Sequence, residues 1–195
     1  ENPQFLQRYD TVVSAELTRI DAIIEELLAY GRLAPAARQK TPINPLIREV
    51  LILIENELDK KQINLKTYFN DDNTQIMANA NQIKQVLMNL LLNAIQAMPQ
   101  NGTLTITTEK ETDSTISDEN LITKLKIIIG DTGCGIAQDQ LPNLFKPFFT
   151  TKSTGTGLGL SISQRIVKEH AGEIAVTSEL NRGTNFIITL PANQP

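Results

Sequence analysis

Apolar residues recur at helical spacing near the start of the chain. Leu6, Val13, Ile20 and Leu27 follow one another at intervals of seven, and other apolar residues fill the positions between them. A seven-residue repeat with so wide an apolar face is typical of a helix in a bundle or a coiled coil. We therefore predict a long bundle-forming helix over residues 3–31.

Three further stretches have the pattern of amphipathic helices. The first begins near Pro45, a residue type favoured in the first turn, and runs to about Lys61. The second covers residues 81–98, where Asn81 is placed to cap the helix. The third covers about residues 158–170.

Other segments alternate between apolar and polar residues, which is the pattern of strands with one buried face. The polar stretch 110–120 separates two of them and predicts a hairpin loop. Strands and helices together predict an α+β fold, a two-layer sandwich in which helices cover one face of a mixed sheet. The predicted strands are residues 63–69, 75–79, 103–109, 124–130, 173–179 and 184–190.

Prolines cluster after the first predicted helix. Pro35, Pro42 and Pro45 interrupt the helical pattern, as expected of a linker or the start of a domain. We therefore divide the chain into a helix that belongs to a separate domain, a linker and a main domain. These three parts are residues 1–34, 35–44 and 45–195.

Composition narrows the class of protein. The chain has 195 residues, 41% of them hydrophobic and 21% charged, which suits a globular domain with a sizeable core. The net charge of −4 provides no basic field for nucleic acid or an anionic membrane. The single cysteine, Cys134, excludes an internal disulfide, and no apolar run approaches the roughly 20 residues that span a bilayer. Because the chain opens without methionine, we expect a fragment of a longer protein.

Two asparagines stand out in the second amphipathic stretch. Asn89 and Asn93 are four residues apart and so share one face of the predicted helix 81–98. Their neutral oxygens are suitable ligands for a hard cation. Two structural amides bonded to nearby loops would give the same pattern.

Two glycine-rich motifs follow. In GDTGCGI (residues 130–136), Asp131 can accept a hydrogen bond from a ligand, and Gly133 and Gly135 leave the backbone open to close approach. In STGTGLGLSI (residues 153–162), alternating glycines lead into a helix, whose N-terminal amides suit a phosphate. A capped glycine turn and a flexible linker are the alternatives that involve no ligand.

Between the glycine motifs lies the aromatic loop LFKPFFTTK (residues 144–152). It contains half of the phenylalanines of the chain, which suggests a loop that packs onto apolar surface. Lys146 and Lys152 are long enough to reach phosphates from there. A small satellite core with solvated lysines is the alternative.

Taken in order, these motifs resemble the N, G1, F, G2 and G3 boxes of the catalytic domain of sensor histidine kinases. The last box corresponds to Arg-Gly-Thr at residues 182–184. The resemblance covers about residues 43–191 and implies the Bergerat-type ATP-binding fold of the GHKL superfamily, which includes type II topoisomerases and mismatch-repair ATPases. The helix 3–31 resembles the second helix of the family's dimerisation and histidine-phosphotransfer domain.

The resemblance implies ATP and Mg²⁺ as cofactors. Asp131 would accept the adenine amino proton, and Thr184 would support the adenine through water. Asn93 would coordinate Mg²⁺ with Asn89 assisting, and residues 137–156 would form a lid over the nucleotide. The residues implied for ATP binding are Asn89, Asn93, Asp131, Gly133, Gly135, Ile136, Lys152, Thr156, Gly157, Leu158, Gly159, Leu160 and Thr184.

The implied activity is transfer of the γ-phosphoryl of ATP to a histidine, and from there to an aspartate of a response regulator. Hydrolytic members of the superfamily have glutamate where this chain has Asn89, and an amide cannot take a proton from water. The resemblance further implies a homodimer through the helical bundle and a cytoplasmic location, even if the parent protein is membrane-anchored. Contact of this fragment with nucleic acid or membrane is not expected.

The sequence departs from the family pattern at three points, the first of which is an acid that is missing before the helix 81–98, where the chain reads ANANQ (residues 78–82). Many members have lysine three residues after the Mg²⁺-binding asparagine, but this chain has Gln96, so we expect Lys152 or Lys146 to provide that charge. The only histidine, His170, lies at the far end of the helix that starts at the second glycine motif. We expect it to cap that helix, and we expect the phosphoacceptor histidine upstream of Glu1.

Two alternative functions remain open. A degenerate module would bind ATP or a partner without transfer, although the complete set of nucleotide boxes argues against it. A serine kinase of the anti-sigma type has the same fold. That class usually lacks the helix 3–31 and the aromatic sequence FFTTK (residues 148–152).

Overall fold

The structure is a computed structural model of the chain. It describes residues 37–70, 74–112, 123–152 and 155–192, together with Tyr9, Val13 and Ile20, which are helical and exposed. Apart from these three residues, the predicted helix 3–31 lies outside the described residues. Residues 113–120 of the predicted loop 110–120 also lie outside the described residues.

The described residues form a mixed sheet, a short two-stranded sheet and three α-helices. Two of the helices are 18 residues long and the third has 11. In chain order the elements are β1 (Gln39–Pro42), α2 (Ile43–Lys60), β2 (Asn64–Phe69), β3 (Gln75–Ala78), α3 (Ala80–Ala97), β4 (Thr103–Thr112), β5 (Thr123–Asp131), the 3₁₀ turn η1 (Leu141–Asn143), α4 (Gly159–Glu169), β6 (Glu173–Glu179) and β7 (Gly183–Pro191).

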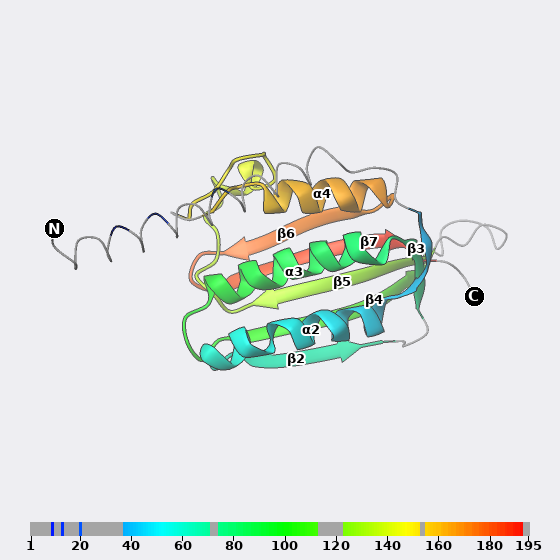
Figure 1. Cartoon of the computed structure of the whole chain (residues 1–195), viewed down its shortest axis with the longest axis horizontal. Helices are drawn as coiled ribbons and strands as arrows, with labels where there is room; N and C mark the ends of the chain where they lie inside the picture. The colour runs from blue at the N-terminus through cyan, green and yellow to red at the C-terminus, as the bar shows by residue number, and fades with distance from the viewer. Residues whose placement is uncertain are drawn as a thin grey trace.

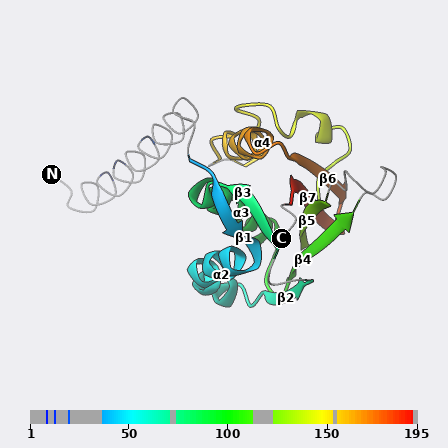
Figure 2. The same cartoon turned by 90° about the vertical axis from the view of Figure 1, so that its right-hand side faces the viewer.

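The main sheet has five strands in the order β2-β4-β5-β7-β6. The pair β2–β4 is parallel, and the other neighbours are antiparallel, so the sheet is mixed. All three helices lie on one face of this sheet, as Figures 1 and 2 show. The predicted α+β sandwich with helices on one face is therefore confirmed.

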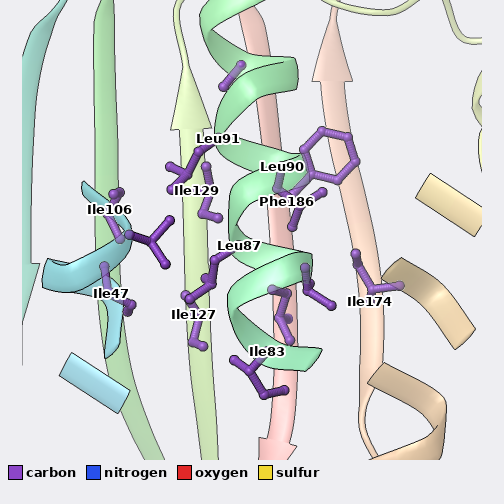
Figure 3. Packing of buried hydrophobic residues seen from close by; sticks show 14 of the residues in the cluster. Ile47, Ile83, Leu87, Leu90, Leu91, Ile106, Ile127, Ile129, Ile174 and Phe186 are labelled. Atoms are coloured by element: carbon purple, nitrogen blue, oxygen red, sulfur yellow. The ribbon is translucent and has the colours of Figure 1, made fainter. Parts of the chain in front are cut away.

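The core lies between the helices and the covered face of the sheet (Figure 3). Leu87, Leu90 and Leu91 of α3 are fully buried. Leu87 and Leu91 lie beside Ile127 and Ile129 of the central strand, and Leu90 lies beside Phe186 of β7. Each such side chain contributes roughly 1.5–3 kcal/mol to stability by leaving water. This packing makes α3 the central helix of the layer, and α3 also carries both asparagines singled out above.

The start of the main domain differs from the prediction. Residues 39–42, inside the predicted linker 35–44, form strand β1, which pairs antiparallel with β3. Helix α2 begins at Ile43, so Pro45 lies in its first turn, as predicted. Pro45 sits at the third helical position, where its missing N–H is one of the donors that a first turn leaves without a helical acceptor. The fully buried Ile43 then anchors this end of the helix in the core.

The cap of α3 also differs. The helix begins at Ala80, and the Oδ1 atom of Asn79 accepts a hydrogen bond from the backbone amide of Gln82 at 3.1 Å. Asn79 is therefore the cap, and the prediction of Asn81 was wrong. Because the sequence ANANQ offers two asparagines two residues apart, local preference does not decide between them.

Candidate functional site

Three polar side chains lie in the second half of α3. Asn89, Asn93 and Gln96 are spaced by four and three residues, so they share one face of the helix. Asn93 Nδ2 donates to Asn89 Oδ1 at 3.3 Å, and Asn89 Nδ2 donates to Ser163 Oγ of α4 at 2.8 Å. The two asparagines therefore form one hydrogen-bonded chain that connects α3 to α4.

Lys152 reaches the hydrogen-bonded asparagines from the loop between β5 and α4. Its Nζ atom donates to Asn93 Oδ1 at 2.6 Å and to Gln96 Oε1 at 2.5 Å. Partial burial lowers the pKa of the Lys152 ammonium, the nearby Cys134 opposes this shift, and Lys61 adds to it. The structure thus places Lys152, rather than Lys146, at the position where the family pattern has a helix lysine.

Asp131 ends β5 beside the C-terminus of α3. It is only 8% exposed, and its Oδ1 atom accepts a hydrogen bond from the backbone amide of Gly133 at 2.7 Å. Loss of water raises the pKa of its carboxyl group, while hydrogen bonds from the backbone amides of Gly133 and Thr184 partly offset the rise. Asp131 is directly opposite Thr184 in the β5–β7 pair, so these two predicted site residues meet.

Ser178 organises the neighbourhood of Thr184. Its hydroxyl oxygen accepts a hydrogen bond from the backbone amide of Ile136 at 2.8 Å and lies 2.9 Å from Thr184 Oγ1. It also donates to the backbone oxygen of Gly183 at 2.9 Å. Ser178 was not among the residues predicted from the sequence. The signal was present, because Ser178 shares a strand face with the apolar Ile174 and Val176, where a polar residue needs a partner.

The glycines of the first motif face protein rather than open space. Gly135 has a positive φ of 67°, and a Cβ atom there would lie 2.1 Å from the backbone oxygen of Glu179. A Cβ atom on Gly133 would lie 2.6 Å from the backbone oxygen of Ala97. These glycines thus let the loop pack between the end of α3 and the β6–β7 turn, a reason that our argument from ligand approach did not foresee.

The second glycine motif places the start of α4 against α3. A Cβ atom on Gly159, the first residue of α4, would lie 2.4 Å from Asn89 Oδ1. Gly157 has a φ of 72° and packs against the backbone of Phe148 in the aromatic loop. Thr156 Oγ1 accepts a hydrogen bond from the backbone amide of Leu158 at 3.3 Å.

The apolar members of the predicted set belong to the core or pack against it. Leu158 is buried, whereas Ile136 and Leu160 are partly buried and contact the core cluster. Positions 153 and 154 of this motif lie outside the described residues.

Together, the predicted residues lie along the last turns of α3. Asp131 and its loop meet the helix at Ala97, whose backbone oxygen accepts a hydrogen bond from Cys134 at 3.1 Å. Lys152 meets it at Asn93 and Gln96. The start of α4 meets it at Asn89, eight residues before Ala97, which corresponds to about 12 Å along the axis.

Cavity size does not pick out this region. A cavity of about 250 Å³ between α3 and α4 touches Asn89, Gly159 and Ser163. A larger one, of about 450 Å³, lies on the outer side of α4 beside Phe145 and contains none of the predicted site residues. The evidence for the site is instead the set of hydrogen bonds among Asn89, Asn93 and Gln96 of α3 and Lys152.

His170 lies away from these groups. It is the C-cap of α4, as predicted, at the opposite end of this 11-residue helix from Gly159 and about 17 Å from it along the axis. Its side chain is buried, Nδ1 lies 2.8 Å from the backbone oxygen of Ile166, and Nε2 accepts a hydrogen bond from the backbone amide of Asn79 at 3.1 Å.

Comparisons with known proteins agree with this arrangement. Residues 78–194 match the family described as histidine kinase-, DNA gyrase B-, and HSP90-like ATPase. The chain is 37% identical over 182 residues to the sensor histidine kinase ZraS of Escherichia coli strain K12, covering 93% of this chain and 37% of that protein. The chain thus spans little more than a third of this curated relative.

Two solved structures of the histidine kinase ThkA are also similar. Its catalytic domain is 36% identical, with a TM-score of 0.69, and the match covers 80% of this chain and 96% of that one. ThkA in complex with the response regulator protein TrrA is 32% identical, with a TM-score of 0.75, over 98% of this chain and 52% of that one.

The region that matches this ATPase family, residues 78–194, contains both glycine motifs, the asparagine pair and the final strands. None of the helices in the described ranges is long and apolar enough to cross a membrane. The chain belongs to the family of histidine kinase, DNA gyrase B and HSP90-like ATPases, within which it is similar along nearly its whole length to sensor histidine kinases.

Proposed function

We propose that this chain is the ATP-binding catalytic portion of a sensor histidine kinase and that it presents the γ-phosphoryl group of ATP to a histidine outside this chain. The observation that carries the proposal is the convergence of a buried carboxylate, two amide oxygens and a lysine ammonium on the last turns of α3. The relatives named above are histidine kinases, which favours this activity over a serine kinase of the anti-sigma type.

Asp131 is the group proposed to recognise adenine. A carboxylate accepts hydrogen bonds only, so it selects the amino group of adenine over a carbonyl at the same place. The backbone amide of Gly133 holds one of its oxygens. The Thr184 hydroxyl, held by Ser178, is proposed to support the base through water, and Ile136 to contact it.

The donor set fits Mg²⁺ delivered together with a nucleotide. The described ranges contain no group of three or more His, Cys, Asp or Glu side chains suited to a metal ion. Mg²⁺ commonly uses one or two protein oxygens and completes its shell with phosphates and water. Asn93 Oδ1 would be the protein oxygen, and the ion would neutralise phosphate charge when bound.

Asn89 is proposed to position Asn93 and to slow hydrolysis. Its oxygen accepts from Asn93 and its nitrogen donates to Ser163, so both ends of the amide are engaged. An amide also lacks the basicity to take a proton from water. The bound nucleotide is thus expected to persist until a better nucleophile arrives.

The phosphates are proposed to lie at the start of α4, where the backbone amides of Gly159 and Leu160 belong to the first turn and have no acceptor within the helix. The Lys152 ammonium, which is held at Asn93 and Gln96, is proposed to add a positive charge for the phosphates. In the transfer step, a histidine nitrogen bonds to the γ-phosphorus, the bond from that phosphorus to the bridging oxygen breaks, and ADP leaves with the electron pair. Such a reaction depends mainly on positioning and charge neutralisation.

His170 is not the proposed acceptor. Its ring nitrogens are both engaged with backbone groups, and the helix α4 separates it from Gly159. Because His170 is the only histidine of the sequence, the acceptor is proposed to belong to another segment of the protein. The proposed next acceptor is an aspartate of a response regulator, since ThkA forms a complex with one.

Three further parts of the proposal concern dimerisation, the extent of the catalytic domain and the location of the protein. The helix predicted over residues 3–31 is proposed to pair in a homodimeric bundle, and residues 45–195 to act as the catalytic domain. A cytoplasmic location is proposed, because response regulators are soluble partners.

Calorimetric titration tests the nucleotide site directly. ADP with Mg²⁺ is expected to bind the wild-type chain, and omission of the metal with a chelator to weaken binding. Asn93→Ala is expected to remove most of the difference between the two conditions, since it removes the proposed metal ligand. Failure of the wild-type chain to bind ADP or ATP under either condition would refute the proposal.

A further inference from the structure

Two side-chain amide oxygens of α3 accept hydrogen bonds from the ammonium group of a lysine in the same chain. The Lys152 ammonium donates to Asn93 Oδ1 at 2.6 Å and to Gln96 Oε1 at 2.5 Å. The acceptors are on a rigid helix, whereas the donor is on the loop that precedes α4. These two charge-assisted hydrogen bonds therefore tie the loop to the helix.

The orientation of Asn93 is set from the other side. Its Nδ2 atom donates to Asn89, whose own amide nitrogen donates to Ser163 of α4. With its nitrogen engaged in this way, Asn93 turns its oxygen toward Lys152. The oxygen is also the only end of an amide that binds a cation. Asn93 thus presents a preformed oxygen for one positive charge.

Gln96 makes the arrangement specific. It is three residues after Asn93, so the two side chains lie side by side on the helix. A lysine at position 96 would carry a charge fixed to the helix. Glutamine instead accepts a charge supplied by the loop, so the charge at this place depends on where the loop lies.

We propose that Asn93 and Gln96 form a seat for the Lys152 ammonium, which holds residues 137–152 against α3 until a magnesium nucleotide displaces the ammonium from Asn93. The displacement rests on the proposed function, because it takes Asn93 Oδ1 as the metal ligand. The tether itself does not. Two cations on one oxygen repel each other, so the metal and the ammonium compete for it. Gln96 is a positioning residue that keeps the released ammonium within reach of the phosphates.

Hydrogen exchange of the nucleotide-free chain tests the tether. Lys152→Met and Gln96→Leu remove its donor and one acceptor while keeping much of the side-chain volume. Backbone amides of residues 137–152 should then exchange about tenfold faster than in the wild type, as expected for loss of a charge-assisted hydrogen bond. Lys146→Met is the matched control, since Lys146 lies in the same loop but the bonds to Asn93 and Gln96 come from Lys152.

Exchange that is equal in the wild type and both test variants would overturn the tether, as would equal acceleration in Lys146→Met. This measurement needs no nucleotide, so it remains informative even if the wild-type chain binds none and the proposed function fails.

Competition is tested with Mn²⁺ in the presence of saturating ADP, because the ion is proposed to arrive with a nucleotide, and binding is followed by electron paramagnetic resonance. Lys152→Met should bind Mn²⁺ about tenfold more tightly than the wild type, because the seat has lost its resident cation. Adding Asn93→Ala to Lys152→Met should abolish that gain. Equal Mn²⁺ affinity in the wild type and Lys152→Met under these conditions would overturn the displacement.

Discussion

The imidazole of His170 joins the two helices of the site at the ends remote from the asparagines. Its Nε2 atom accepts a hydrogen bond from the backbone amide of Asn79, the cap of α3, while Nδ1 lies 2.8 Å from the backbone oxygen of Ile166 in α4. A backbone amide only donates, so Nε2 is unprotonated and Nδ1 carries the ring proton. His170 therefore helps to fix the relation between α3 and α4 on which the Asn89–Ser163 bond depends.

Replacement of His170 should accordingly affect stability. His170→Ala removes both hydrogen bonds and leaves a cavity, so we expect the free energy of unfolding in urea to fall by about 2–4 kcal/mol. His170→Gln retains an acceptor for the Asn79 amide and should cost clearly less. A change below about 0.5 kcal/mol in His170→Ala would contradict the structural role, because surface substitutions have effects of that size.

Long regular patterns in the sequence predicted most of the fold. The strand predicted at residues 173–179 is β6 with both ends correct, and the helix predicted at 81–98 differs from α3 by one residue at each end. Both are confirmed because their apolar residues follow a period that a buried face imposes. The β1 strand was missed because its four residues have no such pattern and pair with β3 far along the chain.

The candidate site was predictable in its parts but not in its contacts. The motifs located Asn93, Asp131 and Thr184 correctly on a helix, a strand end and a strand start. The choice of Lys152 over Lys146 depends on how the loop folds back onto α3, which no local pattern encodes. The hydroxyl of Ser178 likewise gains its role only when β6 pairs with β7.

Asp131→Asn should weaken nucleotide binding. The carboxylate is replaced by an amide that can turn a donor toward the adenine amino group, so we expect a loss of roughly 1.5–3 kcal/mol in binding free energy. Calorimetry with Mg²⁺ and ADP measures this difference. Equal affinities of the variant and the wild type would remove Asp131 from the proposed adenine site.

The same residue should make stability depend on pH. Burial raises the pKa of the Asp131 carboxyl group above its unfolded value of 3.8. Just above pH 3.8 the folded state therefore binds more protons than the unfolded state, and this group's contribution to stability falls as the pH rises through the folded pKa.

Asp131→Asn removes that titration. The unfolding free energy of the variant minus that of the wild type should rise with pH in the window just above 3.8 and then level off. Urea unfolding at a series of pH values measures it. A difference that falls with pH across that window would mean that the pKa is lowered instead.

Gly135 tests whether the first glycine motif serves packing. Gly135→Ala forces a side chain into a positive φ and into the backbone oxygen of Glu179, so we expect a destabilisation of about 2–4 kcal/mol by thermal or urea unfolding. Cys134→Ala, at the exposed neighbouring position, is the control and should change stability little. A neutral Gly135→Ala would show that the close approach to Glu179 is dispensable.

Phosphoryl transfer provides the last prediction. This chain incubated alone with labelled ATP should bind nucleotide without acquiring phosphate on His170, because in-line attack needs reacting atoms within about 3.5 Å and His170 is held at the far end of α4.

A longer form of the protein that carries the acceptor histidine should become labelled with an acid-labile, base-stable phosphate. In that longer form Asn93→Ala should abolish labelling through loss of the proposed metal ligand, whereas His170→Gln should leave it nearly unchanged. Circular dichroism checks that both variants are folded. Labelling that disappears in folded His170→Gln would place the nucleophile on α4 and would refute the assignment of this chain as the ATP-binding portion of a larger kinase.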